Sequence, residues 1–425
     1  MPVLLIAFAA VSLATTLFDL YLRRRQATYV ARHRAAVPFD FAATVSLAEH
    51  QRAADYEIAR LRLGRVAALV SLAVGLAWAF FGYDLLYGGL AGVIGRGLTR
   101  SVAFIAAVSL VSSLLDLPFA AYRAFRLEQR FGFNRTTKLR FAADRLKALA
   151  LSTCVGVPLL YGLFWLMHGV SGLWWVYAWA GSTVLIIALM EAYPRWIAPL
   201  FNRFTPLDGA LRARVEALLR RCGFEASGLF IMDASKRSTH GNAYFSGFGR
   251  MKRIVLFDTL VAQNSEDELE AVLAHELGHY KLGHVITGLL QTAVLLLLAF
   301  FAIGYLCKQP WLLSSFGIIH RDDALALMVC ILVIQMGGPL VSTGANWLSR
   351  RHEYQADDFA RQMVGAAPMI SALVKLSRDN ASTLTTDPLF ALVNFSHPPV
   401  PLRVRHLREH SVSGGAVPAM PVAVP

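Results

Sequence analysis

The sequence predicts a mainly α-helical protein that crosses a membrane several times and carries a small β-sheet outside the bilayer. Three observations support this prediction. The 425 residues are 56% hydrophobic and only 16% charged, whereas about a quarter of the residues of a soluble domain are charged. The apolar residues are gathered into runs of about twenty. Basic residues alternate between the segments that connect these runs.

Seven runs are long enough to cross a bilayer as helices. About twenty residues at a rise of 1.5 Å each span the roughly 30 Å hydrocarbon core. The runs lie at 3–22, 66–83, 101–122, 148–168, 173–193, 285–306 and 324–345. We therefore expect an integral, multi-pass membrane protein with seven transmembrane helices.

The basic residues indicate the side of the membrane on which each segment lies. "RRR" (23–25) follows the first run, and Arg123, Arg126 and Arg130 follow the third, whereas "HGVSG" (168–172) has no lysine or arginine. Because basic segments stay in the cytoplasm, the N-terminus is expected outside and the C-terminus inside. No basic residue precedes the first run, so we expect a retained span rather than a signal peptide. This topology accounts for the net charge of +13, and we expect no nucleic-acid partner.

Five regions are expected along the chain. Spans one to five and their basic loops occupy 1–193, and a cytosolic catalytic segment occupies 194–284. Spans six and seven occupy 285–345, and a second cytosolic segment occupies 346–411. The remaining residues, 412–425, are small and proline-rich, which indicates a disordered tail.

The first cytosolic segment mixes strand and helix signals. "GLFIMDA" (228–234), "NAYFSGFG" (242–249) and "RIVLFDTLV" (253–261) indicate strands that are separated by turn-rich residues. Ser265 followed by Glu268 has the spacing of a capping box, which predicts the start of a helix.

That helix contains the pattern HExxH. His275 and His279 are four residues apart, so they lie on one helical face and can bind one zinc ion. Glu276 can hold a water molecule beside the ion and act as a general base. The alternative is a surface helix with two solvated histidines. His284 lies nine residues from His275, so on a continuous helix it faces away, and we expect it at the surface or at the membrane interface.

A catalytic zinc needs a third protein ligand on the same side of the membrane. The chain returns through the seventh run and immediately reads "SRRHEYQADDFA" (349–360). Glu353 can supply a carboxylate ligand, and Asp357 can accept a hydrogen bond from a ligand histidine. A solvated charged helix would have the same spacing, so this assignment stays open at this point.

The motifs together resemble the type-I CAAX prenyl endopeptidases, which are integral-membrane zinc proteases. The resemblance rests on "LAHELGHYKLGH" (273–284), "SRRHEYQADDFA", "NFSHPP" (394–399) and "SKRSTHGNAYFSGF" (235–248), with further matches at "FGFNRTT" (131–137) and "IAPLFNRFTPL" (197–207). It covers nearly the whole chain except the tail. It implies seven tilted helices around a water-filled chamber, with a zincin-like catalytic domain at the cytosolic end.

The resemblance also implies roles for individual residues. His275, His279 and Glu353 would bind one Zn²⁺, and Glu276 would be the catalytic base. His397 would lie near the reacting carbonyl, and Arg403 aligns with an arginine just beyond it. His397, together with Arg403, would contact the substrate and stabilise the negatively charged oxygen of the transition state. The edge strand at Asn242, Ala243 and Tyr244 would pair with the extended substrate.

The substrate and the compartment are less narrowly defined by the sequence. A peptide or a membrane protein, prenylated or not, would meet the zinc at the edge of the bilayer. The Ala-, Leu- and Arg-rich composition favours a bacterial inner membrane, where quality control of membrane proteins is as plausible as CAAX processing. The alternatives are an intramembrane protease, whose HExxH motif would lie inside an apolar run, and a transporter or channel with a structural zinc.

Overall fold

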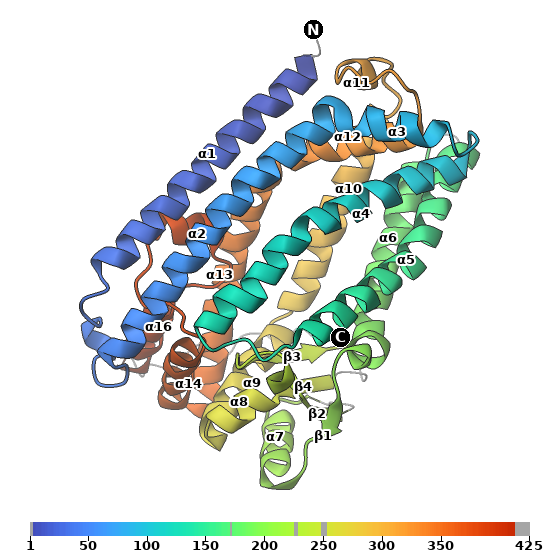
Figure 1. Ribbon diagram of the computed structural model, residues 1–425. Helices are drawn as coiled ribbons and strands as arrows, with labels where there is room; N and C mark the ends of the chain where they lie inside the picture. Colours follow the sequence, from blue (N-terminus) through green and yellow to red (C-terminus); the bar gives the residue numbers. More distant parts are fainter. Residues whose placement is uncertain (1–2, 171, 225–227, 248–252, 413–425) are drawn as a thin grey trace.

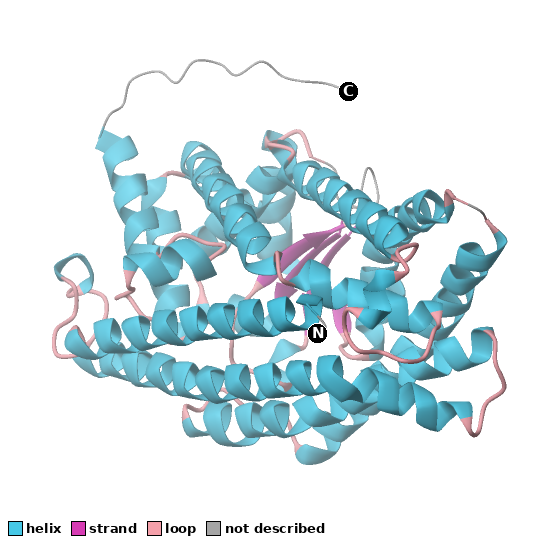
Figure 2. Cartoon of the chain, turned by 90° about the horizontal axis from the view of Figure 1, so that it is seen from above, coloured by secondary structure: helices cyan, strands magenta, loops and turns pink. Residues whose placement is uncertain are grey.

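The computed structural model describes residues 3–170, 172–224, 228–247 and 253–412. Long helices run side by side through most of the molecule, and a small sheet with shorter helices lies at one end of them (Figure 1). The N-terminal end of α1 (Val3–Arg32) lies at the opposite end of the bundle from the sheet. Seen from above, helices surround the strands (Figure 2).

The predicted spans are confirmed, and most of the helices that contain them are longer than the apolar runs. Among the described residues, six helices are long and apolar enough to cross a membrane, and a bent helix pair makes up to seven. Besides α1 they are α2–α3 (Leu47–Ala77 and Tyr83–Ala91, joined by a π-helical turn), α4 (Leu98–Tyr122), α5 (Lys138–Gly169), α6 (Trp174–Ala192) and α10 (His284–Leu306). The span expected at 66–83 thus lies within one helical stretch of 45 residues.

The seventh span is the bent pair. α12 (Asp323–Gln335) meets α13 (Gly338–Val364) at an angle of 55°. The break occurs at Gly337, just before Pro339, whose ring cannot continue a preceding helix but suits the first turn of a new one. The region boundary expected at 345/346 falls inside α13, so one helix runs from the membrane into the soluble end.

The outer surface of the helices is apolar. In the most apolar window of each single span, no more than 17% of the residues are buried inside the protein. Large apolar side chains such as Leu85, Val184 and Leu340 are more than 60% exposed. Such a surface is unfavourable in water and is what a bilayer requires.

Four short strands form the sheet at the other end, in the order β1-β2-β4-β3. They are β1 (Phe204–Pro206), β2 (Gly228–Met232), β3 (Ala243–Ser246) and β4 (Arg253–Phe257). β2 and β4 are parallel, and both outer strands pair antiparallel. The three predicted strands are confirmed in part. In the third run, expected at 253–261, the strand ends at Phe257 and the chain continues as α8 (Asp258–Gln263). Residues 248–249 of the second run and the tail at 413–425 lie outside the described residues.

β1 was not predicted from the sequence. It has three residues, one of them Pro206, so it is too short to show alternation and resembles a loop. Its pairing with Phe230–Met232 of β2 defines it.

Shorter helices complete the soluble end. α9 (Glu266–Lys281) begins at the predicted capping box, in which Ser265 and Glu268 each bond the other's backbone N–H. Leu269, Leu273 and Leu277 of α9 are almost fully buried against the sheet and the neighbouring helices. The other helices are α7 (Gly209–Arg221), α11 (Trp311–Ser314), α14 (Ala366–Asp379), α15 (Pro388–Asn394) and α16 (Val400–Val412).

Candidate metal centre

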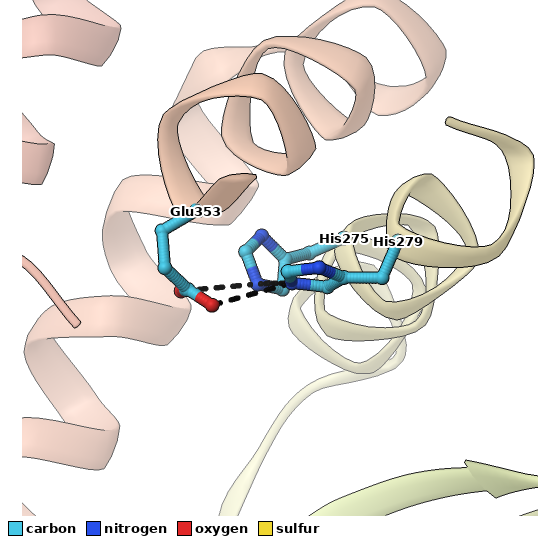
Figure 3. Close-up of side chains that lie close together, drawn as sticks. All are labelled: His275, His279 and Glu353. Carbon is cyan, nitrogen blue, oxygen red and sulfur yellow. Dashed lines mark hydrogen bonds and ion pairs between the residues drawn. The ribbon is translucent and has the colours of Figure 1, made fainter. Parts of the chain in front are cut away.

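His275, His279 and Glu353 come together between α9 and α13 (Figure 3). The two histidine Nε2 atoms are 3.3 Å apart. One oxygen of Glu353 is 3.3 Å from Nε2 of His279, and the other is 3.5 Å from Nε2 of His275. The carboxylate that follows the seventh span therefore meets the two imidazoles that precede the sixth.

These separations fit a metal ion. Two ligand atoms at 2.0–2.1 Å from a tetrahedral zinc lie about 3.3 Å apart. Glu353 Oε2 is buried, and no described residue donates a hydrogen bond to it, although a guanidinium nitrogen of Arg403 lies 3.2 Å away. A bound metal ion would satisfy this oxygen. Two imidazoles and one carboxylate also form a common ligand set of catalytic zinc. His275, His279 and Glu353 therefore suit a zinc ion.

Small residues allow the two helices to approach closely. A Cβ atom on Gly278 would lie 3.1 Å from the backbone of Ala356 and 3.2 Å from Cβ of Phe359. Ala356 and Ala360 are fully buried on the facing side of α13. The glycine within HELGH therefore lets α13 bring Glu353 within reach of the histidines.

Asp357 lies behind His275, as expected from the sequence. Its Oδ1 is 3.0 Å from Nδ1 of His275, which leaves Nε2 free to face Glu353. Burial opposes a positive charge on His275, but the carboxylates of Asp357 and Glu353 outweigh it and raise its pKa to about 9. A metal ion therefore competes with a proton for this imidazole.

Arg403 lies behind the ligands rather than at an open face. Its guanidinium donates to both oxygens of Asp357 at 2.6 and 2.8 Å, and one of its nitrogens is 3.2 Å from Glu353. The side chain is only 9% exposed. This placement favours a role in positioning the carboxylates over the contact with substrate that alignment with the family led us to expect.

The expected surface position of His284 is wrong. His284 is buried, its Nδ1 is 3.0 Å from Nδ1 of His279, and its Nε2 is 2.9 Å from the side-chain oxygen of Gln355. Its ring also stacks on His352 at 4.0 Å. The expectation assumed one continuous helix, but α9 ends at Lys281, and Gly283, at φ +74°, turns the chain into α10. The Leu-Gly pair after the motif was the available signal, because glycine often ends helices.

Glu276 and His397 are the two further residues that the sequence assigns to the chemistry. Glu276 is half-buried, and burial raises the pKa of its carboxyl. Nε2 of His397 is 3.3 Å from Glu353, and its Nδ1 is 2.9 Å from the hydroxyl of Ser396. The His397 side chain is 64% exposed but faces a recess, where desolvation lowers its pKa.

Two cavities reach the centre from different sides. One of about 500 Å³ contacts His397 and is also lined by Arg23, Arg60 and Arg123. The other, of about 490 Å³, lies between α10 and α13 and contacts His279 and His284. His275 and Glu353 are therefore buried, whereas the partly exposed His279 and the space next to the ligands are accessible.

The predicted edge strand lies beside the metal helix. β3 is the last strand of the sheet, and the ring of Phe245 packs 5.6 Å from that of Tyr280 on α9. Asn242 precedes the strand, and its backbone oxygen accepts from Phe257 of β4. Because the bonding direction alternates along an antiparallel strand, the polar groups of Tyr244 face β4 and those of Phe245 face the free edge. Ala243 faces the same edge, although its N–H donates to the side chain of Asn242.

Comparison with known proteins agrees with this architecture. The protein-family model for the CAAX prenyl protease N-terminal region, with five membrane helices, matches residues 26–203. The family model for peptidase family M48 matches residues 207–411. The CAAX prenyl protease 1 homologue of Arabidopsis thaliana is 35% identical over 92% of this chain and 94% of its own. The human homologue is 32% identical over 73% of this chain and 74% of its own. The crystal structure of S. mikatae Ste24p superposes with a TM-score of 0.88 at 30% identity, covering 95% of this chain and 98% of that one.

The comparisons support an enzyme and give no support for a transporter or channel. The matched relatives named above are eukaryotic, so they also give no support for the bacterial inner membrane expected from composition. The helices, the HExxH centre and the similarity along nearly the whole chain lead to one conclusion: this chain is an integral-membrane metalloprotease that belongs to the CAAX prenyl protease group of peptidase family M48.

Proposed function

We propose that this protein is a zinc endopeptidase that cleaves extended peptides at the cytosolic edge of the membrane. The observation that supports this most is the set of ligand atoms of His275, His279 and Glu353, which are 3.3–3.5 Å apart. When bound there, zinc supplies a Lewis acid that polarises the scissile carbonyl and acidifies a water molecule.

The residues around the ligands divide the remaining tasks. Glu276 takes a proton from the attacking water and delivers it to the leaving amine, and its raised pKa suits both transfers. His397, at the accessible side, donates to the oxygen that becomes negative in the transition state. Asp357 and Arg403 hold His275 and Glu353 in place.

The edge of β3 supplies the peptide-binding surface in this proposal. The N–H of Phe245 and the C=O groups of Ala243 and Phe245 face away from β4, so an extended peptide can add to the sheet as a further strand. Asn242 fixes the start of this edge, because its side chain accepts from the N–H of Ala243. The peptide backbone, rather than particular side chains, would then align with the metal helix.

The position of the site relative to the membrane favours substrates with an apolar anchor. α9 is followed after two residues by α10, which is a span. The basic ends of other spans contact the same end of the molecule: Arg25 pairs with Asp387 at 2.9 Å, and Arg140 donates to the backbone of Lys236. Basic segments mark the cytoplasmic side, so the centre is assigned to the cytosolic face. Because the relatives are named CAAX prenyl proteases, a prenylated C-terminal peptide is the substrate we propose.

The test compares a farnesylated CAAX peptide with the same peptide lacking the lipid, using purified protein in detergent or liposomes. We expect cleavage of the farnesylated peptide with the higher kcat/KM, and loss of cleavage in Glu276→Gln protein that still contains zinc. Equal rates on both peptides would contradict prenyl recognition and favour a broader role on membrane proteins. Full activity of the Glu276→Gln protein would contradict the assignment of the base.

A further inference from the structure

A second cluster of side chains that could bind a metal ion lies between α13 and α16. Asp358 of α13 and His406 and His410 of α16 offer ligand atoms that all lie within 4.8 Å of one another. His406 and His410 are four residues apart on one helix, the same spacing as His275 and His279.

Two of these atoms are buried and lack hydrogen bonds. Nε2 of His406 lies 3.1 Å from Oδ1 of Asp358, but the two atoms do not have hydrogen-bond geometry, and neither has a hydrogen-bond partner among the described residues. Leaving both atoms in this state is unfavourable. A cation between them would satisfy both, and their separation is close to the roughly 3.3 Å between two ligands of one zinc ion.

The third residue has one ring nitrogen engaged and one available for a metal ion. Nδ1 of His410 is 2.8 Å from the backbone oxygen of His406, so Nδ1 carries the proton and donates it. In the neutral imidazole, Nε2 of His410 then carries the lone pair that a metal ion needs. His410 is exposed, which leaves room for water to complete the coordination.

A simple ion pair is the competing explanation. Protonated His406 could pair with Asp358, and Arg361 also lies 3.6 Å from the same oxygen and donates to the backbone of His410. Arg361 has its own acceptor there, and its Nε lacks a hydrogen-bond partner among the described residues. The ion-pair explanation gives His410 no role, whereas the metal explanation requires it. This difference makes the two explanations separable.

We propose that Asp358, His406 and His410 bind a second divalent cation of the zinc class, independent of the HExxH centre. Two imidazoles and one carboxylate suit zinc and related first-row ions rather than magnesium or calcium. The ion would join α16 to α13. Since α16 also carries Arg403, which holds Asp357 and Glu353 of α13, the second ion would secure the helix that supports the catalytic ligands.

The test measures zinc per chain in the purified full-length protein after equilibration with buffered free zinc. We expect two ions in the unchanged protein, and one in each of the His410→Ala, Asp358→Asn and His275→Ala variants. His275→Ala removes the catalytic ion and should keep the second. His33→Ala is the matched control, because His33 is also exposed and its Nδ1 also bonds the carbonyl four residues earlier, at 2.8 Å; it should retain two.

Each other outcome argues against the site. A single ion in the unchanged protein that is lost in His275→Ala would mean that only the catalytic centre binds zinc. Two ions that persist in both His410→Ala and Asp358→Asn would place the second ion elsewhere. Because His410 is exposed, its substitution should leave the fold intact, and a thermal unfolding curve checks this for every variant.

Discussion

Oδ1 of Asp357 lies 3.0 Å from Nδ1 of His275, on the side of the imidazole opposite Glu353. One carboxylate therefore orients the ring and another completes the ligand set. Both come from a single helix, α13, one turn apart. The metal centre consequently depends on the rotation of α13 about its own axis as much as on the motif in α9.

Replacing Asp357 by asparagine should weaken zinc binding. The substitution removes the charge that orients His275 and stabilises Arg403, and loss of such a partner typically costs 10- to 100-fold in metal affinity. A chelator competition assay at neutral pH measures the change at the catalytic centre. Asp208→Asn, which removes an exposed carboxylate that pairs with Arg212, is the control and should leave this affinity unchanged. Equal affinities of the Asp357→Asn and unchanged proteins would contradict the role of Asp357.

Replacing Glu276 by glutamine should lower kcat by roughly 10²- to 10⁴-fold, the usual contribution of a general base. Zinc content should stay at the level of the unchanged protein, because Glu276 is not among the ligand atoms. Peptide cleavage and metal analysis on the same samples check both statements. Glu266→Gln, at the exposed start of the same helix, should cleave normally.

Replacing Phe245 by proline should raise KM for peptide substrates. Proline removes the N–H that faces the free edge of β3, and proline is tolerated at such edges. The ring of Phe245 also packs on Tyr280, so Phe245→Ala is needed as the control that loses the ring and keeps the N–H. We expect a larger increase in KM for proline than for alanine, whereas equal increases would show that only the ring matters.

Glu268 should make the protein sensitive to acid. Burial opposes its ionisation, but donors from Ser371, the backbone of Ser265 and Lys375 outweigh burial and lower its pKa from 4.5 to about 2. Since the folded-state pKa is depressed, the ionised group contributes about 3 kcal/mol of stability above pH 4.5. This contribution is lost as the pH falls from 4.5 towards 2.

Thermal unfolding as a function of pH checks this prediction. Glu268→Gln should lower the Tm at neutral pH and reduce its decline between pH 4.5 and 2. Lys375→Met removes the partner at 2.9 Å and should also lower the Tm at neutral pH, with an effect that fades as the pH falls below 4.5. If the Tm of the Glu268→Gln protein declined between pH 4.5 and 2 as steeply as that of the unchanged protein, other groups would cause the acid sensitivity.

The sequence predicted the parts of the structure that depend on composition and on spacing within one element. The apolar runs, the capping box at Ser265 and the pair His275 and His279 all belong to this class. Glu353 was reached because topology returned it to the correct side of the membrane, although spacing alone could not separate it from a solvated helix.

Other features depend on contacts between distant segments. β1 is defined only by its pairing with β2. His284 faces the metal centre because a left-handed glycine interrupts the helix. Arg403 is 50 residues from Glu353 in the sequence, and only the packing of α16 on α13 shows that it supports the ligands. Patterns within one segment cannot report such contacts.

The turn at Gly283 fixes the depth at which this enzyme can work. With two residues between the metal helix and the sixth span, the reacting atoms cannot move away from the lipid without unwinding one of the two helices. A peptide that is anchored in the bilayer at one end would be cut only at a bond far enough from the anchor to reach the metal centre. The number of residues between the anchor and the scissile bond would then select substrates independently of their side chains.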